Sequence, residues 1–269
     1  MRGWWQDLSD LVLPAQCAGC GRSRTSLCAR CTAALRGAAP SRVRPRPAPP
    51  RLPVVHAAAP YRDAVRAVLL AHKERGALGL ARPLGTALAG AVRAGLPGQG
   101  PGRGGTEAGV VALVPVPSAP GAVRARGHDP MRRIAYAAAA ELRRSGVPAR
   151  VLPVLRQRRP VADQAGLDAA QRLANVTGAL EVAGGSGGLF AEIGRIVLVD
   201  DLMTTGASLA EAARVLGALR RSVSGSGEDS EGGAGRERAR TEPGIPSGPT
   251  MIEAAVIAAS PDSFEINRN

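Results

Sequence analysis

The chain has almost no lysine and few aromatic side chains. Lys73 is its single lysine, so arginine supplies nearly all of the 35 Lys and Arg residues, and aromatic residues make up 2% of the 269 positions. Proteins that bind single-stranded nucleic acid by base stacking need several aromatic rings, so this scarcity argues against that class. The net charge of +13 accompanies abundant Ala, Gly and Pro, a composition typical of GC-rich codon usage. The charge alone therefore does not indicate nucleic-acid binding, although arginine suits phosphate groups and a polyanionic partner stays open.

Long apolar runs are also missing. No stretch approaches the roughly 18 uncharged apolar residues of a membrane span. Residues 1–13 contain Asp7 and Asp10 where a secretory signal would be apolar. We therefore expect a soluble, cytoplasmic protein with no membrane span. A P-loop is excluded, because its Gly-x-x-x-x-Gly-Lys pattern needs a lysine that Lys73, which follows His72, does not supply.

Segments poor in large apolar residues divide the chain. Residues 38–53 are dense in Pro and Arg and predict a semi-rigid linker. Residues 222–249 cannot bury enough apolar surface to offset their ordering entropy, which predicts a disordered insert. We expect an N-terminal helix and cysteine segment over 1–37, the linker over 38–53, and a main domain over 54–269 that contains the insert.

Strand-like and helix-like segments alternate between these breaks. Apolar runs predict strands and a 3.6-residue periodicity predicts helices. The expected strands cover residues 54–59, 110–116, 150–155, 195–200 and 251–258, and the expected helices cover residues 62–71, 78–92, 130–145 and 208–221. This alternation predicts an α/β fold with a mostly parallel sheet flanked by helices. Ligands of such sheets bind at the carboxyl ends of the strands.

All four cysteines lie within fifteen residues, as two Cys-x-x-Cys pairs. In a chain without a secretory signal, this spacing favours a structural zinc site over disulfides. A redox pair or unrelated reduced cysteines are the alternatives. The predicted Zn²⁺ ligands are Cys17, Cys20, Cys28 and Cys31.

The most informative segment is a buried strand followed by two carboxylates and a hydroxyl-rich turn. Residues 196–199 are apolar, and Asp200 and Asp201 follow them directly. The turn before the next expected helix contains Thr204, Thr205, Gly206, Ala207 and Ser208. Hydroxyls and free backbone N–H groups at a helix N-terminus form an anion site that suits a phosphate monoester. The alternative is that a hydroxyl merely caps the helix and the two acids belong to a turn.

Residues 196–208 resemble the phosphoribosyl-diphosphate (PRPP) motif of type I phosphoribosyltransferases. They agree with it at the two acids, the two threonines, the glycine and the terminal hydroxyl. The resemblance implies that Asp200 and Asp201 hold the ribose 2′ and 3′ hydroxyls, that residues 204–208 hold the 5′-phosphate, and that Mg²⁺ bridges the diphosphate. It also implies a type I phosphoribosyltransferase-like sheet.

Further segments extend the resemblance to the ComF family of competence proteins. Residues 114–117, Val-Pro-Val-Pro, followed by Arg-Ala-Arg-Gly-His-Asp at 124–129, look like a paired motif of that family. Residues 156–175 are similar to its hood segment, with Arg, Gln-Ala-Gly-Leu and Arg-Leu-Ala-Asn in order. The cysteine pairs lie in front of these segments, as in the family. At 128–130, His-Asp-Pro replaces the family's usual Phe-Asn-Gln, a departure at the acceptor end of the site.

The resemblance implies a phosphoribosyltransferase, an enzyme of the glycosyltransferase class, that binds PRPP with Mg²⁺ and serves DNA uptake or nucleotide metabolism. Arg124 and Arg126 are then expected to neutralise the diphosphate, with solvated surface charge as the alternative, and Lys73 could reach it too. With Asp200 and Asp201 they are the predicted catalytic residues. The acceptor, a base or another nucleophile, is not specified. The alternative function is a non-enzymatic PRPP sensor, or a factor associated with single-stranded DNA or competence-machinery proteins.

Overall fold

The structure is a computed structural model that describes residues 16–97, 109–162, 166–185, 187–190, 193–225 and 252–267. Predictions that concern residues 1–15, 98–108, 163–165 and 226–251, which include most of the expected insert, lie outside the described residues. Within the described part of the chain, no helix is both long enough and apolar enough to cross a membrane.

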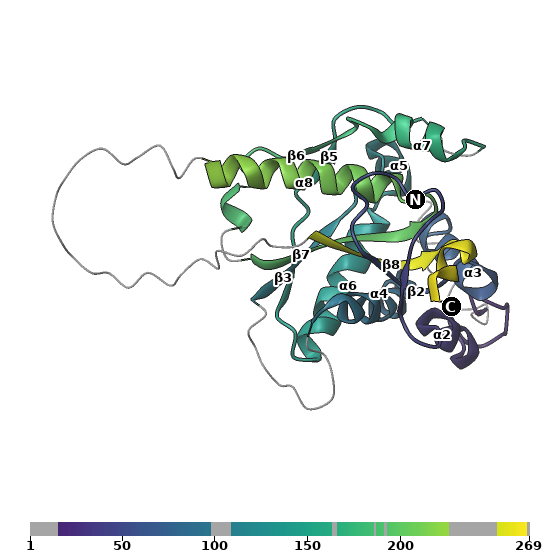
Figure 1. Cartoon of the computed structure of the whole chain (residues 1–269). Coiled ribbons are helices and arrows are strands. Elements are labelled where there is room, and N and C mark those ends of the chain that lie inside the picture. Colours follow the sequence, from purple (N-terminus) through teal and green to yellow (C-terminus); the bar gives the residue numbers. More distant parts are fainter. Residues whose placement is uncertain are drawn as a thin grey trace, which may run out of the picture.

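A six-stranded sheet forms the centre of the molecule (Figure 1). Its strands, in spatial order, are β1 (Ser41–Val43), β2 (Val55–Pro60), β8 (Ile252–Ala259), β7 (Ile193–Met203), β3 (Val110–Pro115) and β4 (Ala149–Val151). β1 pairs antiparallel with β2, and every other neighbouring pair is parallel. The predicted α/β class with a mostly parallel sheet is confirmed.

Helices cover both faces of this sheet, which explains why its strands are continuous apolar runs. α3 (Asp63–Glu74), α4 (Ala81–Gly95) and α6 (Pro130–Arg144) pack on one face, and α8 (Ala207–Gly225) packs on the other (Figure 1). Because side chains alternate along a strand, Val197 and Val199 of β7 belong to the first core, whereas Ile196 and Leu198 belong to the second. Short 3₁₀ turns cover Leu78–Leu80, Gly187–Phe190 and Pro261–Asn267.

The segment expected as a linker contributes to the sheet. Ser41–Val43 form the edge strand β1, and Val43 is buried in the core beside α8. The Arg44 N–H donates a hydrogen bond of 2.9 Å to the Ser263 carbonyl. The three residues of β1 lie between Pro40 and Pro45 and contain no proline, so their N–H groups are free for pairing. Residues 41–43 therefore belong to the folded sheet.

The expected strand over 150–155 is two short strands of two different sheets. β4 ends at Val151, and β5 (Leu155–Gln157) pairs antiparallel with β6 (Leu180–Val182). Pro153 lies between them and has no N–H with which to continue the ladder. β5, β6 and the intervening helix α7 (Ala169–Val176) form a small layer above the sheet, which we call the hood (Figure 1).

Three helices have no counterpart among the expected helices, and one of them is α7 of the hood. α2 (Ala29–Arg36) follows the last cysteine, and α5 (Pro120–Arg126) follows β3 after a short loop. α8 continues to Gly225, so the first four residues of the expected insert are helical. No proline interrupts that stretch of sequence, and helices end most readily at such breakers.

Candidate functional site

The candidate site lies where the winding of the sheet reverses. From β3 the chain crosses through α6 to β4 on one side, and from β7 it crosses through α8 to β8 on the other. The crevice at the carboxyl ends of two such strands is the usual ligand site of an open α/β sheet. β3 ends at Pro115, opposite Val199, whereas β7 continues beside β8 to Met203. Asp200 and Asp201 therefore lie on a strand that projects beyond its neighbour.

A pocket of about 690 Å³ opens at this projecting end. Its walls come from α3, the loop after β3, the hood, β7 and the first turn of α8. The lining residues include Lys73, Ser118, Gln157, Arg172, Asp200, Asp201, Thr204 and Ser208. This size lies within the usual range of small-molecule sites, about 300–1,000 Å³. We call it the main pocket.

The single lysine of the chain pairs with one of the two predicted ribose-binding acids. Lys73 Nζ lies 2.9 Å from Asp201 Oδ2, and the Asp201 side chain is only 13% exposed. The Asp201 carboxylate raises the pKa of Lys73, against the opposing effects of partial burial and of the nearby Arg126. Sequence analysis assigned Lys73 only a secondary role, because 128 positions separate it from Asp201.

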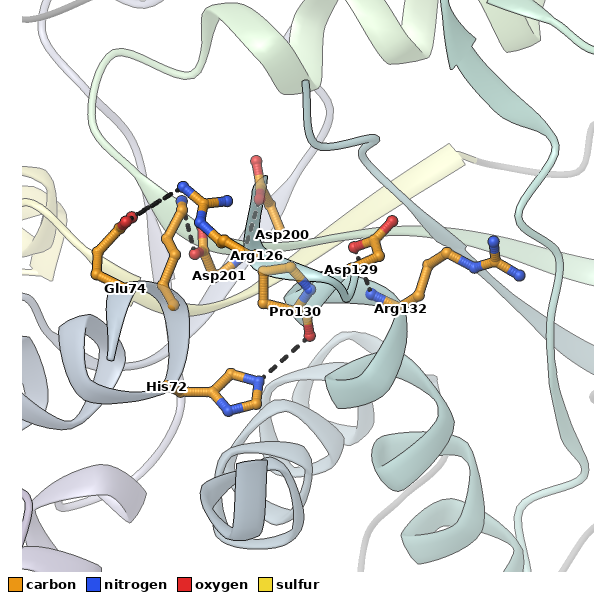
Figure 2. A network of polar contacts seen from close by, with 9 residues as sticks. His72, Glu74, Arg126, Asp129, Pro130, Arg132, Asp200 and Asp201 are labelled. Atoms are coloured by element: carbon orange, nitrogen blue, oxygen red, sulfur yellow. Dashed lines mark hydrogen bonds and ion pairs between the residues drawn. The ribbon is translucent and has the colours of Figure 1, made fainter. Parts of the chain in front are cut away.

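Asp200 lies next to this ion pair, in surroundings that disfavour its negative charge. Burial, and then repulsion from Asp201, raise the pKa of Asp200 well above its ordinary value, although Lys73 and the Asp201 N–H oppose that rise. The Asp201 N–H donates a 2.8 Å hydrogen bond to Asp200 Oδ1 (Figure 2). The two neighbouring carboxylates thus share one lysine, and a donor group of a ligand would relieve their repulsion.

The hydroxyl-rich turn joins β7 to α8 as predicted. Gly206 has a φ of 77°, and Ala207 is the first residue of α8, so the first N–H groups of this 19-residue helix have no partner within it. Thr204 and Ser208 line the main pocket, and Thr205 is half-buried beside them. A β-carbon on Gly206 would come within 2.9 Å of the Leu52 side chain. Glycine is therefore required here by its positive φ and by the packing of Leu52 under the turn.

The two arginines that were predicted to bind the diphosphate, Arg124 and Arg126, make different contacts. Arg126 pairs with Glu74 at 3.0 Å (Figure 2), and its charge opposes the rise in the pKa of Lys73. Neither arginine lines the main pocket, and Arg124 lines a second pocket beside it. Arg126 is thus the one of the two whose charge acts on the Lys73–Asp201 ion pair.

The hood covers the main pocket from above and is fixed by polar contacts. Gln157 and Arg172 line the pocket, and Arg172 Nε is buried with no hydrogen-bond partner among the described residues. Asn175 accepts from the Ala162 N–H and donates to the Ala162 carbonyl, which closes the loop in front of α7. The buried Glu211 of α8 accepts from the Gly178 N–H at 2.8 Å. The Gly178–Glu211 hydrogen bond therefore ties the hood to α8.

Two histidines lie behind the site. Both ring nitrogens of the buried His72 face carbonyl oxygens, with Nδ1 3.2 Å from Ala77 O and Nε2 3.4 Å from Pro130 O (Figure 2). Burial lowers the pKa of His72 despite those carbonyls. Its ring centroid is 6.2 Å from that of His128, and His128 lines neither pocket. His72 therefore ties the end of α3, which carries Lys73, to the start of α6.

The four cysteines form a compact cluster on the N-terminal segment. All four Sγ atoms lie within 4.8 Å of one another, and those of Cys20 and Cys28 are 3.6 Å apart. Zinc–sulfur bonds of about 2.3 Å in a tetrahedron give Sγ separations of roughly 3.8 Å, so the cluster can hold a zinc ion. None of the four is in a disulfide.

The surroundings of the cluster favour the thiolate form of Cys17 and oppose that of Cys31, and they leave no room for a side chain at Gly19. Burial opposes ionisation of Cys17, but N–H groups of Cys28, Cys20 and Gly19 outweigh it and lower the pKa of Cys17 to about 6. The Cys28 N–H lies 3.3 Å from Cys17 Sγ. Burial raises the pKa of Cys31. A β-carbon on Gly19 would come within 2.7 Å of Cys31 Sγ. The cluster is thus closed around its sulfur atoms.

In comparisons with models of known protein families and with curated protein sequences, the chain has no match.

Proposed function

We propose that this protein binds PRPP together with Mg²⁺ in the main pocket and transfers the phosphoribosyl group to an acceptor. One observation carries the proposal. Two adjacent acids, a hydroxyl-rich turn at a helix N-terminus and the chain's single lysine meet in one pocket of suitable size. Each part has a counterpart in PRPP: ribose hydroxyls for the acids, the 5′-phosphate for the turn, and the diphosphate for the lysine.

The energetics of the acids support this assignment. Asp200 is buried next to a second carboxylate, which raises its pKa and makes its negative charge unfavourable. Ribose hydroxyls donate hydrogen bonds, and hydrogen bonds to charged groups contribute about 1.5–3 kcal/mol each. A ligand with two vicinal hydroxyls would therefore lower the free-energy cost of keeping Asp200 charged.

The turn and the lysine would hold the two anionic ends of the ligand. The unpaired N–H groups of α8 and the hydroxyls of Thr204 and Ser208 point to the 5′-phosphate. Lys73 would exchange Asp201 for a diphosphate oxygen, with Arg126 close enough to share the charge. Mg²⁺ would arrive with the diphosphate and neutralise part of its charge when bound.

The transfer itself is a displacement at C1 of the ribose. The C1–O bond to the diphosphate breaks, and its electron pair leaves with the diphosphate. The acceptor's lone pair forms the new bond to C1, and the acceptor proton passes to solvent. Such centres react with oxocarbenium character, so the protein contributes by fixing the sugar, neutralising the leaving group and excluding water. The hood is the part of the fold that covers the pocket from solvent.

The four-cysteine cluster completes the proposal as a structural zinc site. It holds four thiol ligands and leaves no open position for a substrate, which is typical of structural rather than catalytic zinc. The purified protein should contain about one zinc per chain.

Binding and turnover test the proposed function directly. PRPP with Mg²⁺ should raise the melting temperature, because a ligand bound only by the native state stabilises it by mass action. The double variant Asp200→Asn/Asp201→Asn should lose this response, with affinity reduced roughly 100-fold or more if each acid contributes as a charged hydrogen bond. A wild-type response in the double variant would show the ribose assignment to be wrong.

Product formation distinguishes a phosphoribosyltransferase from the non-enzymatic alternative. Incubation with PRPP and Mg²⁺ across a library of bases, followed by diphosphate release, should identify an acceptor. Binding of PRPP without diphosphate release for any acceptor would instead favour a PRPP sensor or competence factor.

A further inference from the structure

A second pocket adjoins the main one. It has a volume of about 310 Å³ and lies between the loop after β3, α5, the start of α6 and β5. Pro117, Ser118 and Gln157 line both pockets, so the two share a wall. A group bound in one pocket is thus next to a group bound in the other.

The lining of the second pocket is rich in arginine. Arg124, Arg132 and Arg156 line it, and Arg156 is paired with Glu181 at 2.9 Å. The guanidinium groups of Arg124 and Arg132 have no ion-pair or hydrogen-bond partner among the described residues. Figure 2 shows the Arg132 side chain extending away from Asp129.

The only acid in the lining does not neutralise these two arginines. Asp129 Oδ1 accepts the backbone N–H of Arg132 at 3.1 Å, which caps α6, and Asp129 forms no ion pair among the described residues. Two arginines with free guanidinium groups on one small pocket favour an anion, since each can bind a carboxylate or phosphate in a bidentate manner.

The other side chains of the lining are mostly apolar. Four prolines, at positions 115, 117, 120 and 153, line the pocket together with Val123 and Leu155. Proline rings present flat apolar surface and restrict the backbone. Such a lining suits a flat ring, and the volume of the pocket admits a small one.

We propose that the second pocket is the acceptor subsite, and that it selects a planar acceptor carrying a carboxylate or phosphate held by Arg124 and Arg132. The inference rests on the proposed function, which requires an acceptor beside the main pocket. It assigns Arg124 to the acceptor rather than to the diphosphate, and it gives the acceptor a charge that the sequence does not specify.

Direct binding of small probes tests the subsite without turnover. Nicotinate and nicotinamide form a matched pair, in which a carboxylate replaces a neutral amide on the same ring, and phenyl phosphate provides the phosphate. Dissociation constants are measured by calorimetry with and without ribose 5-phosphate. We expect at least one anionic probe to bind tenfold or more tightly than nicotinamide, and the better of the two anions identifies the preferred group.

Charge-matched variants locate the effect. In Arg124→Gln/Arg132→Gln, the affinity for the anionic probe should fall to the affinity for nicotinamide. Arg66→Gln/Arg133→Gln removes two exposed charges from α3 and α6 that line neither pocket, and it should keep the preference. Equal affinity of anionic and neutral probes in the wild type, or a preference retained in the first variant, overturns the subsite.

The outcomes separate the subsite from the proposed function. A wild type that responds to PRPP with Mg²⁺ but has no anionic preference keeps the function and loses the subsite. A wild type with the preference but no response to PRPP keeps an anion site and loses the function. A thymidine oligonucleotide that displaces the anionic probe at lower concentration than any small anion overturns the small-acceptor assignment in favour of a nucleic-acid strand.

Discussion

The four-cysteine cluster and the main pocket are assembled in opposite ways. The cysteines lie within fifteen consecutive residues, and their own short loops bring the sulfur atoms together. The main pocket combines residues from Tyr61 to Ser208, and its central ion pair spans 128 positions. The cysteine cluster can therefore be predicted from local spacing, whereas the main pocket depends on the order of strands in the sheet.

A change in one of these two regions should leave the binding properties of the other intact. The following variants test whether the two regions are independent in this way.

The largest effect is expected from removing a zinc ligand. Cys31→Ser deletes the most buried sulfur of the cluster and should abolish zinc binding, from about one ion per chain to none. Because metal binding and folding of such segments are coupled, residues 17–37 should become sensitive to protease. The measurements are metal content and limited proteolysis.

The PRPP response of the same variant is the control. It should persist, since no cysteine lines the main pocket. Equal protease resistance of Cys31→Ser and wild type, or of wild type with and without chelator, would contradict a structural metal.

A smaller effect is expected from adding one methyl group beside the sulfurs. In Gly19→Ala the new β-carbon would approach Cys31 Sγ, and overpacking of this kind costs about 1–3 kcal/mol. Zinc affinity should fall roughly 10- to 100-fold in competition with a chelator, while all four thiols remain. The control is Ala18→Gly, which only removes a methyl group. Gly21→Ala is less suitable, because Gly21 has a positive φ that alanine adopts with strain. Unchanged affinity in Gly19→Ala would contradict the closed geometry of the cluster.

In the main pocket, Lys73→Met should weaken PRPP binding about tenfold while leaving zinc content unchanged. The substitution gives a side chain of similar length but removes the positive charge that pairs with Asp201 and would bind the diphosphate. A hydrogen bond between charged groups contributes about 1.5–3 kcal/mol, consistent with a change of this order. Calorimetry with PRPP and Mg²⁺ measures it, and Arg66→Gln, which removes an exposed charge from the same helix, is the matched control. An equal loss of affinity in both variants would show only a general effect of charge.

The smallest effect concerns how Asp200 changes the stability of the protein with pH. The raised pKa of Asp200 means that the folded state holds this proton more tightly than the unfolded state. Its contribution to stability therefore falls as pH rises from the ordinary carboxyl value of 3.8 through the raised pKa. Asp200→Asn should match wild type in acid and melt about 2–4 °C higher at neutral pH, the shift that ~1 kcal/mol gives at this size. A variant less stable than wild type at neutral pH would contradict the cost assigned to this acid.

The comparison also shows what the sequence could predict. Cysteine spacing and the acid-and-hydroxyl turn each depend on neighbouring residues, and the structure has both as expected. The positions of most strands followed from apolar runs for the same reason. The pairing of Lys73 with Asp201, and the projection of β7 beyond β3, depend on which strands are neighbours, and periodicity carries no such information.

The incorrect boundaries have local causes. Residues 150–155 looked like one apolar strand, but Pro153 breaks the ladder between β4 and β5. The proline-rich composition of residues 38–53 concealed the three residues of β1, which are too short to show a period of their own. Arg124 and Arg126 lie on the same short helix α5, but Arg124 lines the second pocket whereas Arg126 pairs with Glu74.

The packing of Leu52 beneath Gly206 bears on how this protein can be divided. The sequence places a domain boundary between residues 53 and 54, and a shortened chain that begins there would omit the cysteine cluster, as intended. It would also remove β1 from the edge of the sheet and the Leu52 side chain that packs against Gly206 of the hydroxyl-rich turn. A truncation that begins at residue 38 would remove the cysteine cluster and still retain both β1 and Leu52.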